Sequence, residues 1–252
     1  MNSKLSIIKW LIALIYLSLI IIGVTFLIKN YNISDFFSYE FLRLNKDTIL
    51  NYKNENFLIL TIMFFIFSIV WTLLLGFAMP LLIFSGFVFG KWWGILLVLT
   101  STTIGASLLY FLASLFFRDI IQKKFAPRFS KLKKFFNQNE LVYFMFFRFI
   151  GGGGTPYAIQ NTLPILFNMS MKNYIIATFL GSMPSMFVTV SIGSGIENVI
   201  DQNATLGVAD VIFSPEIYIP IVCFFILLLI GFIIKKNYFK EEISLTDSNN
   251  LN

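Results

Sequence analysis

The sequence predicts an all-α polytopic membrane protein. Its predicted architecture is an inverted repeat of two re-entrant hairpins, each followed by a transmembrane helix, with flanking N- and C-terminal transmembrane helices. Hydrophobic residues make up 57% of the 252 residues and charged residues only 13%, whereas about a quarter of a soluble domain is charged. Apolar runs long enough to cross a bilayer recur, and they are continuous rather than alternating, which indicates helices. The charges between these runs indicate the side of the membrane on which each connection lies.

Residues 1–56 are predicted to form an N-terminal transmembrane anchor and an external amphipathic segment. The run 10–28 is apolar and follows Lys4 and Lys9. No small-residue cleavage site follows this run, so a retained anchor is favoured over a cleaved signal peptide. The next segment carries equal numbers of cations and anions. A short surface helix is indicated there by positions at helical spacing: Phe37, Phe41, Leu44 and Thr48.

The connecting segments differ in charge. Residues 118–138 contain seven cations and one anion, whereas residues 196–216 contain four anions and no cation. Cytoplasmic loops of membrane proteins are enriched in Lys and Arg, which places the first segment in the cytoplasm and the second outside. Lysines near both ends of the chain place both termini in the cytoplasm.

The central domain, residues 57–195, must reconcile this topology with its length. Its first apolar stretch begins outside and ends inside, yet it is long enough for two spans of ~20 residues. Its second stretch begins and ends inside. Both constraints are met if two re-entrant hairpins, 57–90 and 141–168, precede the spans 92–117 and 172–195. Glycines and prolines are predicted to shape the hairpins and their packing: Gly76, Pro80, Gly86, Gly90, Gly105, Pro156, Pro164, Gly181 and Pro184.

A repeat of 76 residues supports this arrangement. Ser85 falls opposite Asn161 at the same offset. Inverted repeats with broken helices are a common way to build a transporter site near the bilayer midplane. Two unrelated kinked segments are the alternative. The matching pairs are Gly76 and Gly152, Pro80 and Pro156, Thr102 and Thr178, and Gly105 and Gly181.

Residues 196–252 are predicted to form an external loop, a C-terminal transmembrane helix over 217–234 and a cytoplasmic tail. The basic segment between the two hairpins has apolar residues on one predicted helix face and lysines on the other. A helix lying on anionic lipid fits this pattern, with a solvated loop as the weaker alternative. Its membrane-surface residues would be Arg118, Lys123, Lys124, Arg128, Lys131, Lys133 and Lys134.

The sequence lacks the residues that several kinds of active site and metal site require. The chain has no histidine and a single cysteine, Cys223, inside the last apolar run. Histidine-dependent nucleophiles and metal sites are therefore excluded, and no enzyme activity, metal or cofactor is predicted. The net charge of +6 is attributed to cytoplasmic loops and anionic lipid rather than to a nucleic-acid partner.

The stretch FRFIGGGGTPYAIQN contains the candidate binding site, with Arg148 as its centre. One interpretation is a phosphate site, in which the guanidinium group and the backbone N–H groups of four glycines bind the anion. The other is that Arg148 extends to the cytoplasmic headgroups or pairs with Glu140. Asn161 either contacts the substrate or ties down the hairpin. The glycines are Gly151, Gly152, Gly153 and Gly154.

Two runs carry a resemblance to a known family. Residues 86–118, with GFVFGKWWG, and residues 146–185, with the Arg, Gly-rich loop, Asn and ATFLGSMP, resemble the SNARE-associated Golgi protein family, the VTT-domain, DedA-like superfamily. The resemblance implies two facing re-entrant hairpins and a role in lipid translocation or membrane maintenance. DedA proper has carboxylates near its first hairpin, and residues 76–86 have none. The chain therefore resembles the Golgi-vesicle-type branch more closely.

Two function classes follow. The first is scramblase- or flippase-like translocation of a phosphate-headgroup lipid through a groove between the hairpins. The second is a non-transporting membrane scaffold for membrane homeostasis or assembly. The predicted partners are membrane lipids, either anionic phospholipid or polyprenyl phosphate, together with further copies of the chain as a homo-oligomer. The predicted location is the bacterial plasma membrane.

Overall fold

The computed structural model describes residues 39–74, 76, 78–125, 136, 139–150 and 156–202, with isolated positions near both chain ends. These residues form five helices and contain no strand. The predicted terminal spans, 10–28 and 217–234, lie outside the continuously described part. The helices are α3 (Tyr39–Leu73), α4 (Ala78–Phe125), α6 (Glu140–Phe149), α7 (Tyr157–Leu166) and α8 (Met171–Gln202).

Three stretches within these helices are long and apolar enough to cross a bilayer. They are Glu40–Leu73, Ala78–Phe116 and Met171–Ile196. The predicted class, an all-α membrane protein, is confirmed for the part of the chain that the structure describes. Many large apolar side chains of α3 are exposed, including Leu58 and Ile62, as expected for a surface that faces lipid.

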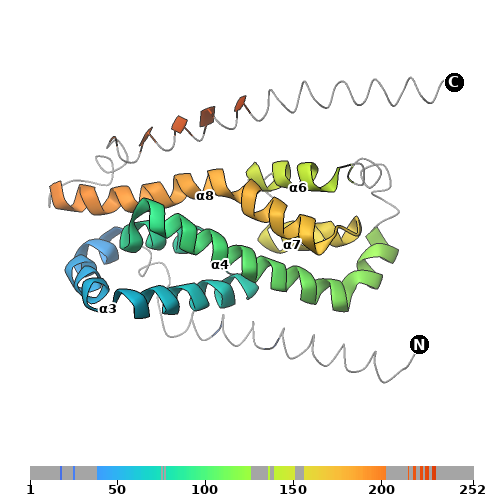
Figure 1. Ribbon diagram of the computed structural model, residues 1–252, viewed down its shortest axis with the longest axis horizontal. Helices are drawn as coiled ribbons and strands as arrows, with labels where there is room; N and C mark the ends of the chain where they lie inside the picture. The colour runs from blue at the N-terminus through green and yellow to red at the C-terminus, as the bar shows by residue number, and fades with distance from the viewer. Residues whose placement is uncertain are drawn as a thin grey trace.

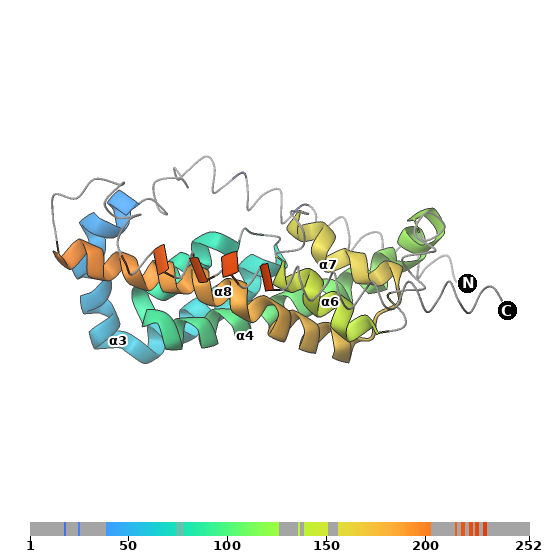
Figure 2. The same ribbon diagram turned by 90° about the horizontal axis from the view of Figure 1, so that it is seen from above.

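The long helices α4 and α8 run antiparallel and form the centre of the molecule (Figure 1). At one end, the Arg118 guanidinium group near the end of α4 donates to Asn168 Oδ1, just before α8, at 2.9 Å. At the other end, the Trp92 ring lies 5.5 Å from the Phe187 ring. Helix α3 lies at one end of this pair, and α6 and α7 lie at the other (Figures 1 and 2).

The second half of α3 and the first turns of α4 form an antiparallel helix hairpin. The Phe57 and Phe89 rings are 6.3 Å apart and the Phe64 and Phe84 rings are 6.0 Å apart. Two kinks delimit this hairpin, at Asn56 (φ −130°, ψ 37°) and at Gly90 (φ 75°, ψ 173°). Gly90 adopts a left-handed conformation that glycine tolerates readily, which lets the chain turn from the hairpin into the long part of α4.

The segment from α6 to α7 forms a second, wider hairpin, in which α6 packs mainly against α8 and α7 packs mainly against α4. The Phe136 and Phe167 rings stack 4.5 Å apart at its open end, while Arg148 contacts Asn161 near its closed end. Asn139 caps α6 by accepting a hydrogen bond from Val142 N, and Pro156 is the N-cap residue of α7. The glycines at 151–154 lie outside the described residues.

Each hairpin packs against a glycine of the long helix that follows it. A Cβ added to Gly105 of α4 would lie 2.7 Å from the Ile69 carbonyl oxygen and 2.7 Å from Thr72 Cβ. A Cβ added to Gly181 of α8 would overlap the Met145 carbonyl oxygen and lie 2.8 Å from Arg148 Cβ. The contacting residues correspond at an offset of 76: Ile69 and Met145, Thr72 and Arg148, and Gly105 and Gly181. The two hairpins therefore share one mode of packing.

Polar contacts hold the turn between α7 and α8 from two sides. Asn168, with φ 59°, accepts hydrogen bonds from Arg118 and from Gln122 of α4. Glu140 of α6 accepts from Ser170 N at 3.2 Å and from Asn173 Nδ2 at 2.6 Å. These polar groups gather at the end of the molecule where the second hairpin opens.

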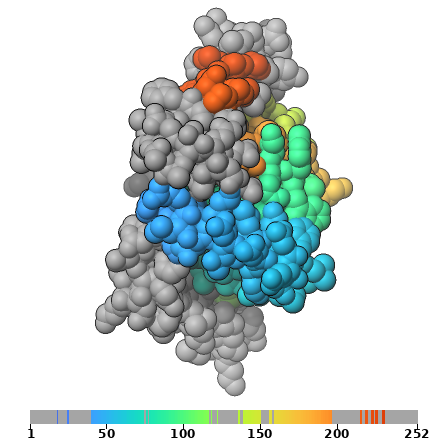
Figure 3. Space-filling model, turned by 90° about the vertical axis from the view of Figure 1, so that its left-hand side faces the viewer, coloured from blue at the N-terminus to red at the C-terminus, as the bar shows by residue number. Residues whose placement is uncertain are grey.

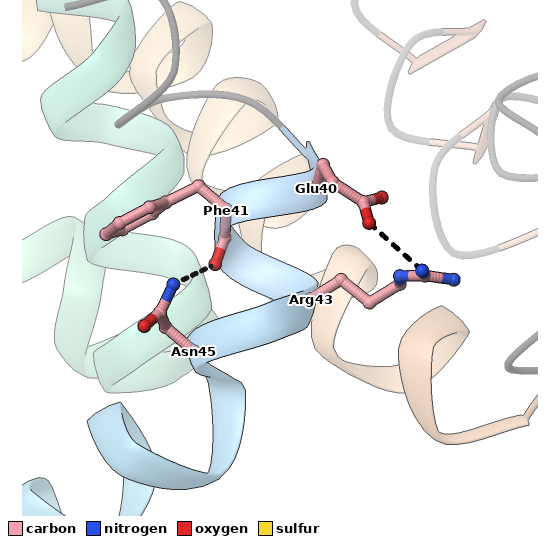
Figure 4. Close-up of polar contacts among 4 residues, drawn as sticks. All are labelled: Glu40, Phe41, Arg43 and Asn45. Atoms are coloured by element: carbon pink, nitrogen blue, oxygen red, sulfur yellow. Dashed lines mark hydrogen bonds and ion pairs between the residues drawn. The ribbon is translucent and has the colours of Figure 1, made fainter. Parts of the chain in front are cut away.

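The first turns of α3 carry their own local contacts. Glu40 and Arg43 form an ion pair of 3.0 Å at the surface, and Asn45 Nδ2 donates to the Phe41 carbonyl oxygen at 2.9 Å (Figure 4). This part of α3 covers one end of the molecule (Figure 3). An exposed ion pair of this kind contributes about 0–1 kcal/mol, so it positions side chains more than it stabilises the fold.

Candidate functional site

Arg148 is buried near the end of α6, where its side chain is only 5% exposed. Its Nη2 donates to the Tyr174 hydroxyl at 2.9 Å and to Asn161 Oδ1. Its Nη1 donates to Gln160 Oε1 at 3.4 Å. The guanidinium carbon also lies 5.0 Å from the centre of the Phe144 ring, within range of a cation–π interaction.

No carboxylate of a described residue forms an ion pair with Arg148. Glu140, a partner considered from the sequence, is bonded instead to Ser170 and Asn173. The burial of Arg148 is also inconsistent with a side chain that extends to the headgroups. The positive charge is therefore surrounded by neutral oxygens and aromatic rings, an environment in which an uncompensated charge is costly.

Asn161 is fully buried and lies at the centre of the contacts around Arg148. Its Nδ2 donates to the Tyr157 carbonyl oxygen at 2.8 Å, one turn earlier in α7. This bond leaves Oδ1 free to accept from Arg148 and from the Tyr174 hydroxyl, the latter at 2.8 Å. The structure thus brings together Arg148 and Asn161, two of the residues predicted from the sequence.

Two tyrosines that sequence reasoning missed complete the site. The Tyr174 ring is 4.3 Å from the Tyr110 ring, with 12° between the planes, and its hydroxyl lies 3.2 Å from the Ala106 carbonyl oxygen. The Tyr110 hydroxyl donates to the Met169 carbonyl oxygen at 2.6 Å. A tyrosine inside an apolar run was the available signal, because a buried hydroxyl requires a polar partner.

The remaining predicted residues are distributed around this site. Gly181 contacts Arg148 directly, whereas Gly86 contacts the distant end of α8. Pro164 lies inside α7 and Pro184 inside α8. Of the predicted membrane-surface residues, Arg118 contacts Asn168. The side chains at 123, 124, 128, 131, 133 and 134 lie outside the described part, as do the glycines at 151–154.

Comparison with known proteins identifies the central region. Residues 77–195, which include α4, α6, α7 and most of α8, match the family model of the VTT domain. This chain carries a VTT domain. The match confirms the predicted VTT-domain family for these residues, and the three long apolar helices support an integral membrane protein. All the residues that contact Arg148 lie within the VTT domain.

Two curated relatives are similar to this chain. A protein named "Transmembrane protein 41 homolog" from Dictyostelium discoideum is 27% identical over 172 residues, which cover 64% of this chain and 49% of that protein. A protein of the same name from Caenorhabditis elegans is 28% identical over 137 residues, covering 51% of this chain and 54% of that protein. The chain spans about half the length of these curated relatives. No solved structure matches it.

Proposed function

We propose that this protein moves lipids with a phosphate headgroup between the two leaflets of a membrane. The observation that carries the proposal is the buried Arg148, which forms no ion pair with a carboxylate of a described residue. A cation at membrane depth is expensive and commonly marks a substrate pathway. A lipid phosphate passing Arg148 would compensate its charge. The resemblance of the VTT domain to a family implicated in lipid translocation supports the same conclusion.

The proposal includes a membrane topology. The hairpin of α3 and α4 and the hairpin of α6 and α7 are re-entrant, enter from opposite faces and form an inverted repeat. Their antiparallel ring contacts support hairpins. Their positions at opposite ends of the α4–α8 pair support opposite entry (Figure 1). The matched contacts of Gly105 and Gly181 support the repeat. The lipid headgroup would move through a groove between the hairpins.

This topology predicts the result of cysteine labelling in intact cells. In a Cys223→Ala background, Asn54→Cys on α3 should react with a membrane-impermeant maleimide added outside. Lys172→Cys at the start of α8 should react only after the membrane is opened. Both positions are exposed in the structure, so neither label should be blocked by packing. Reaction of both cysteines from the same side would contradict opposite entry of the two hairpins.

Lipid transfer itself is tested with purified protein in liposomes. The liposomes carry a fluorescent phospholipid in both leaflets, and an impermeant reductant bleaches the outer leaflet. The protein should make inner-leaflet lipid accessible, so that bleaching proceeds beyond the level in protein-free liposomes. An unrelated helical membrane protein reconstituted at the same density controls for bilayer defects. Bleaching equal to that control would contradict lipid translocation.

A non-transporting scaffold is the second candidate, and one observation favours it. Arg148 connects α6 with α7 through Asn161 and with α8 through Tyr174. An arginine with this role holds helices together without binding a substrate. A protein that remains folded and shows no lipid transfer in liposomes would support this second function. The plasma membrane location and the assembly into a homo-oligomer are predictions under either function.

A further inference from the structure

Three residues at the start of the longer part of α4 form an exposed cluster. Lys91, Trp92 and Trp93 follow the kink at Gly90, and all three are exposed. The Trp92 side chain is 71% exposed, although its ring lies 5.5 Å from the Phe187 ring of α8. An indole ring has a large apolar body and one N–H donor, so it is best placed where apolar and polar surroundings meet. Two exposed tryptophans beside a lysine therefore indicate contact with an environment of both kinds.

The surface next to this cluster changes from polar to apolar along α3. The change occurs at the kink at Asn56, because the exposed residues are polar in the turn before it and apolar in the turn after it. The Phe57 ring lies 6.4 Å from the Trp93 ring, so the change occurs at the level of the cluster. Exposed apolar side chains of a membrane-spanning segment face lipid chains, and exposed polar ones face water or headgroups. The polar residues are Asn54 and Glu55, and the apolar ones are Phe57, Leu58 and Ile59.

The helix that begins at the cluster is as long as a lipid bilayer is thick. From Lys91 to Arg118, α4 continues without a further break, and at ~1.5 Å per residue this stretch measures about 40 Å. A bilayer measures about 40–45 Å when its headgroup layers are included. Residues 92–117 contain no charged residue, so Lys91 and Arg118 are the first cations at the two ends of an apolar stretch. With Arg118 in one headgroup layer, Lys91 reaches the other.

We propose that Lys91, Trp92 and Trp93 form a lipid-binding anchor in the interfacial layer of one membrane leaflet. The two indole rings lie at the level of the lipid ester groups, and the Lys91 ammonium group lies among the headgroups. The partner is bilayer lipid rather than a protein, because the polar-to-apolar change and the length of α4 place the cluster in this layer independently. In the proposed topology the leaflet is the outer one. The anchor is separate from Arg148 and goes beyond the proposed function, since it holds whether or not the protein transfers lipid.

The test is the depth of Trp92 in a bilayer. The chain has four tryptophans, and Trp10→Phe, Trp71→Phe and Trp93→Phe together leave Trp92 as the single fluorophore of the full-length protein. This variant is reconstituted in phosphatidylcholine vesicles whose acyl chains carry bromine, a fluorescence quencher, either near the ester group or near the methyl end. Because its ring would lie about 15 Å from the bilayer centre, Trp92 should be quenched about twofold more by the shallow bromines than by the deep ones.

A position halfway along the same helix provides the matched control. Ile104 is exposed and lies midway between Lys91 and Arg118, so Ile104→Trp, with all four native tryptophans changed to Phe, should show the opposite preference. Equal or stronger quenching of Trp92 by the deep bromines overturns the proposal. Absence of quenching at Trp92, while the Ile104→Trp variant is quenched, also overturns it, because a protein surface rather than lipid then covers the cluster.

A second measurement leaves the other tryptophans in place. In a Cys223→Ala background, a nitroxide label is attached in the Trp92→Cys or the Ile104→Cys variant. The label at position 92 should collide both with dissolved oxygen, which concentrates among the lipid chains, and with a water-soluble nickel chelate. The label at position 104 should collide with oxygen alone. Equal exclusion of the nickel chelate from both positions would place the cluster inside the hydrocarbon layer and contradict the anchor.

Discussion

Arg148→Gln should reduce lipid transfer at least tenfold while leaving the protein folded. The substitution removes the positive charge that would attract the phosphate under the proposed function, and charge-assisted hydrogen bonds are about twice as strong as neutral ones. The fold should survive because the Tyr174 hydroxyl can still donate to Asn161 Oδ1, 2.8 Å away. We therefore expect a loss of only about 1 kcal/mol in the free energy of unfolding. Liposome transfer and thermal unfolding measure the two effects.

Two further variants, Arg148→Lys and Arg118→Gln, make this result interpretable. Lys keeps the charge but lacks the planar fork, so transfer should be intermediate between wild type and Arg148→Gln. Arg118→Gln is the matched control, because Arg118 bonds Asn168 at the end of α4, away from Arg148. It should transfer lipid normally. Full transfer by Arg148→Gln would contradict the phosphate interpretation and favour the scaffold.

Gly86→Ala should destabilise the protein by about 3 kcal/mol, at the upper end of the range for overpacked interiors. A Cβ at Gly86 would overlap the Val190 carbonyl oxygen and lie 2.8 Å from Ser194 N. The contact is reciprocal, since a Cβ at Gly193 would overlap the Ile83 carbonyl oxygen. These atoms belong to helix backbones and cannot rotate away, so α4 and α8 would have to separate. Thermal unfolding in detergent measures the change.

Gly90→Ala separates crowding from backbone strain. Gly90 has φ 75°, but a Cβ there would have no atom within 4 Å. Its substitution should cost only backbone strain, about 1–3 kcal/mol, because φ 75° and ψ 173° lie in a region essentially restricted to glycine. If Gly86→Ala proved as stable as wild type, the close approach of α4 and α8 would not contribute to stability as the structure indicates.

Much of the fold could be predicted from composition and residue order. The apolar runs determine a helical membrane protein, because backbone polar groups in lipid must be satisfied within each segment. The helix breaks fall where local chemistry favours them, at Gly76, Gly90 and Pro156, since glycine and proline interrupt helices through their own backbone properties. The offset of 76 residues found in the sequence recurs in the matching contacts of Gly105 and Gly181. Arg148 could be identified as a candidate site residue, because a cation among apolar residues is costly in a membrane and usually marks a functional position.

The tertiary structure decided what surrounds that cation. Glu140, eight residues before Arg148, was the nearest candidate partner in sequence, but the structure places Asn161 and Tyr174 there, 13 and 26 residues later. The pairing follows from the packing of α6 against α8 at Gly181, which brings the Tyr174 face of α8 onto the arginine. The hydrogen-bond partners of a buried group depend on which helices pack around it and on which of their polar groups are not already bonded to something else. The local sequence pattern does not show which helices converge, so the hydrogen-bond partners of Arg148 could be identified only from the packed helices.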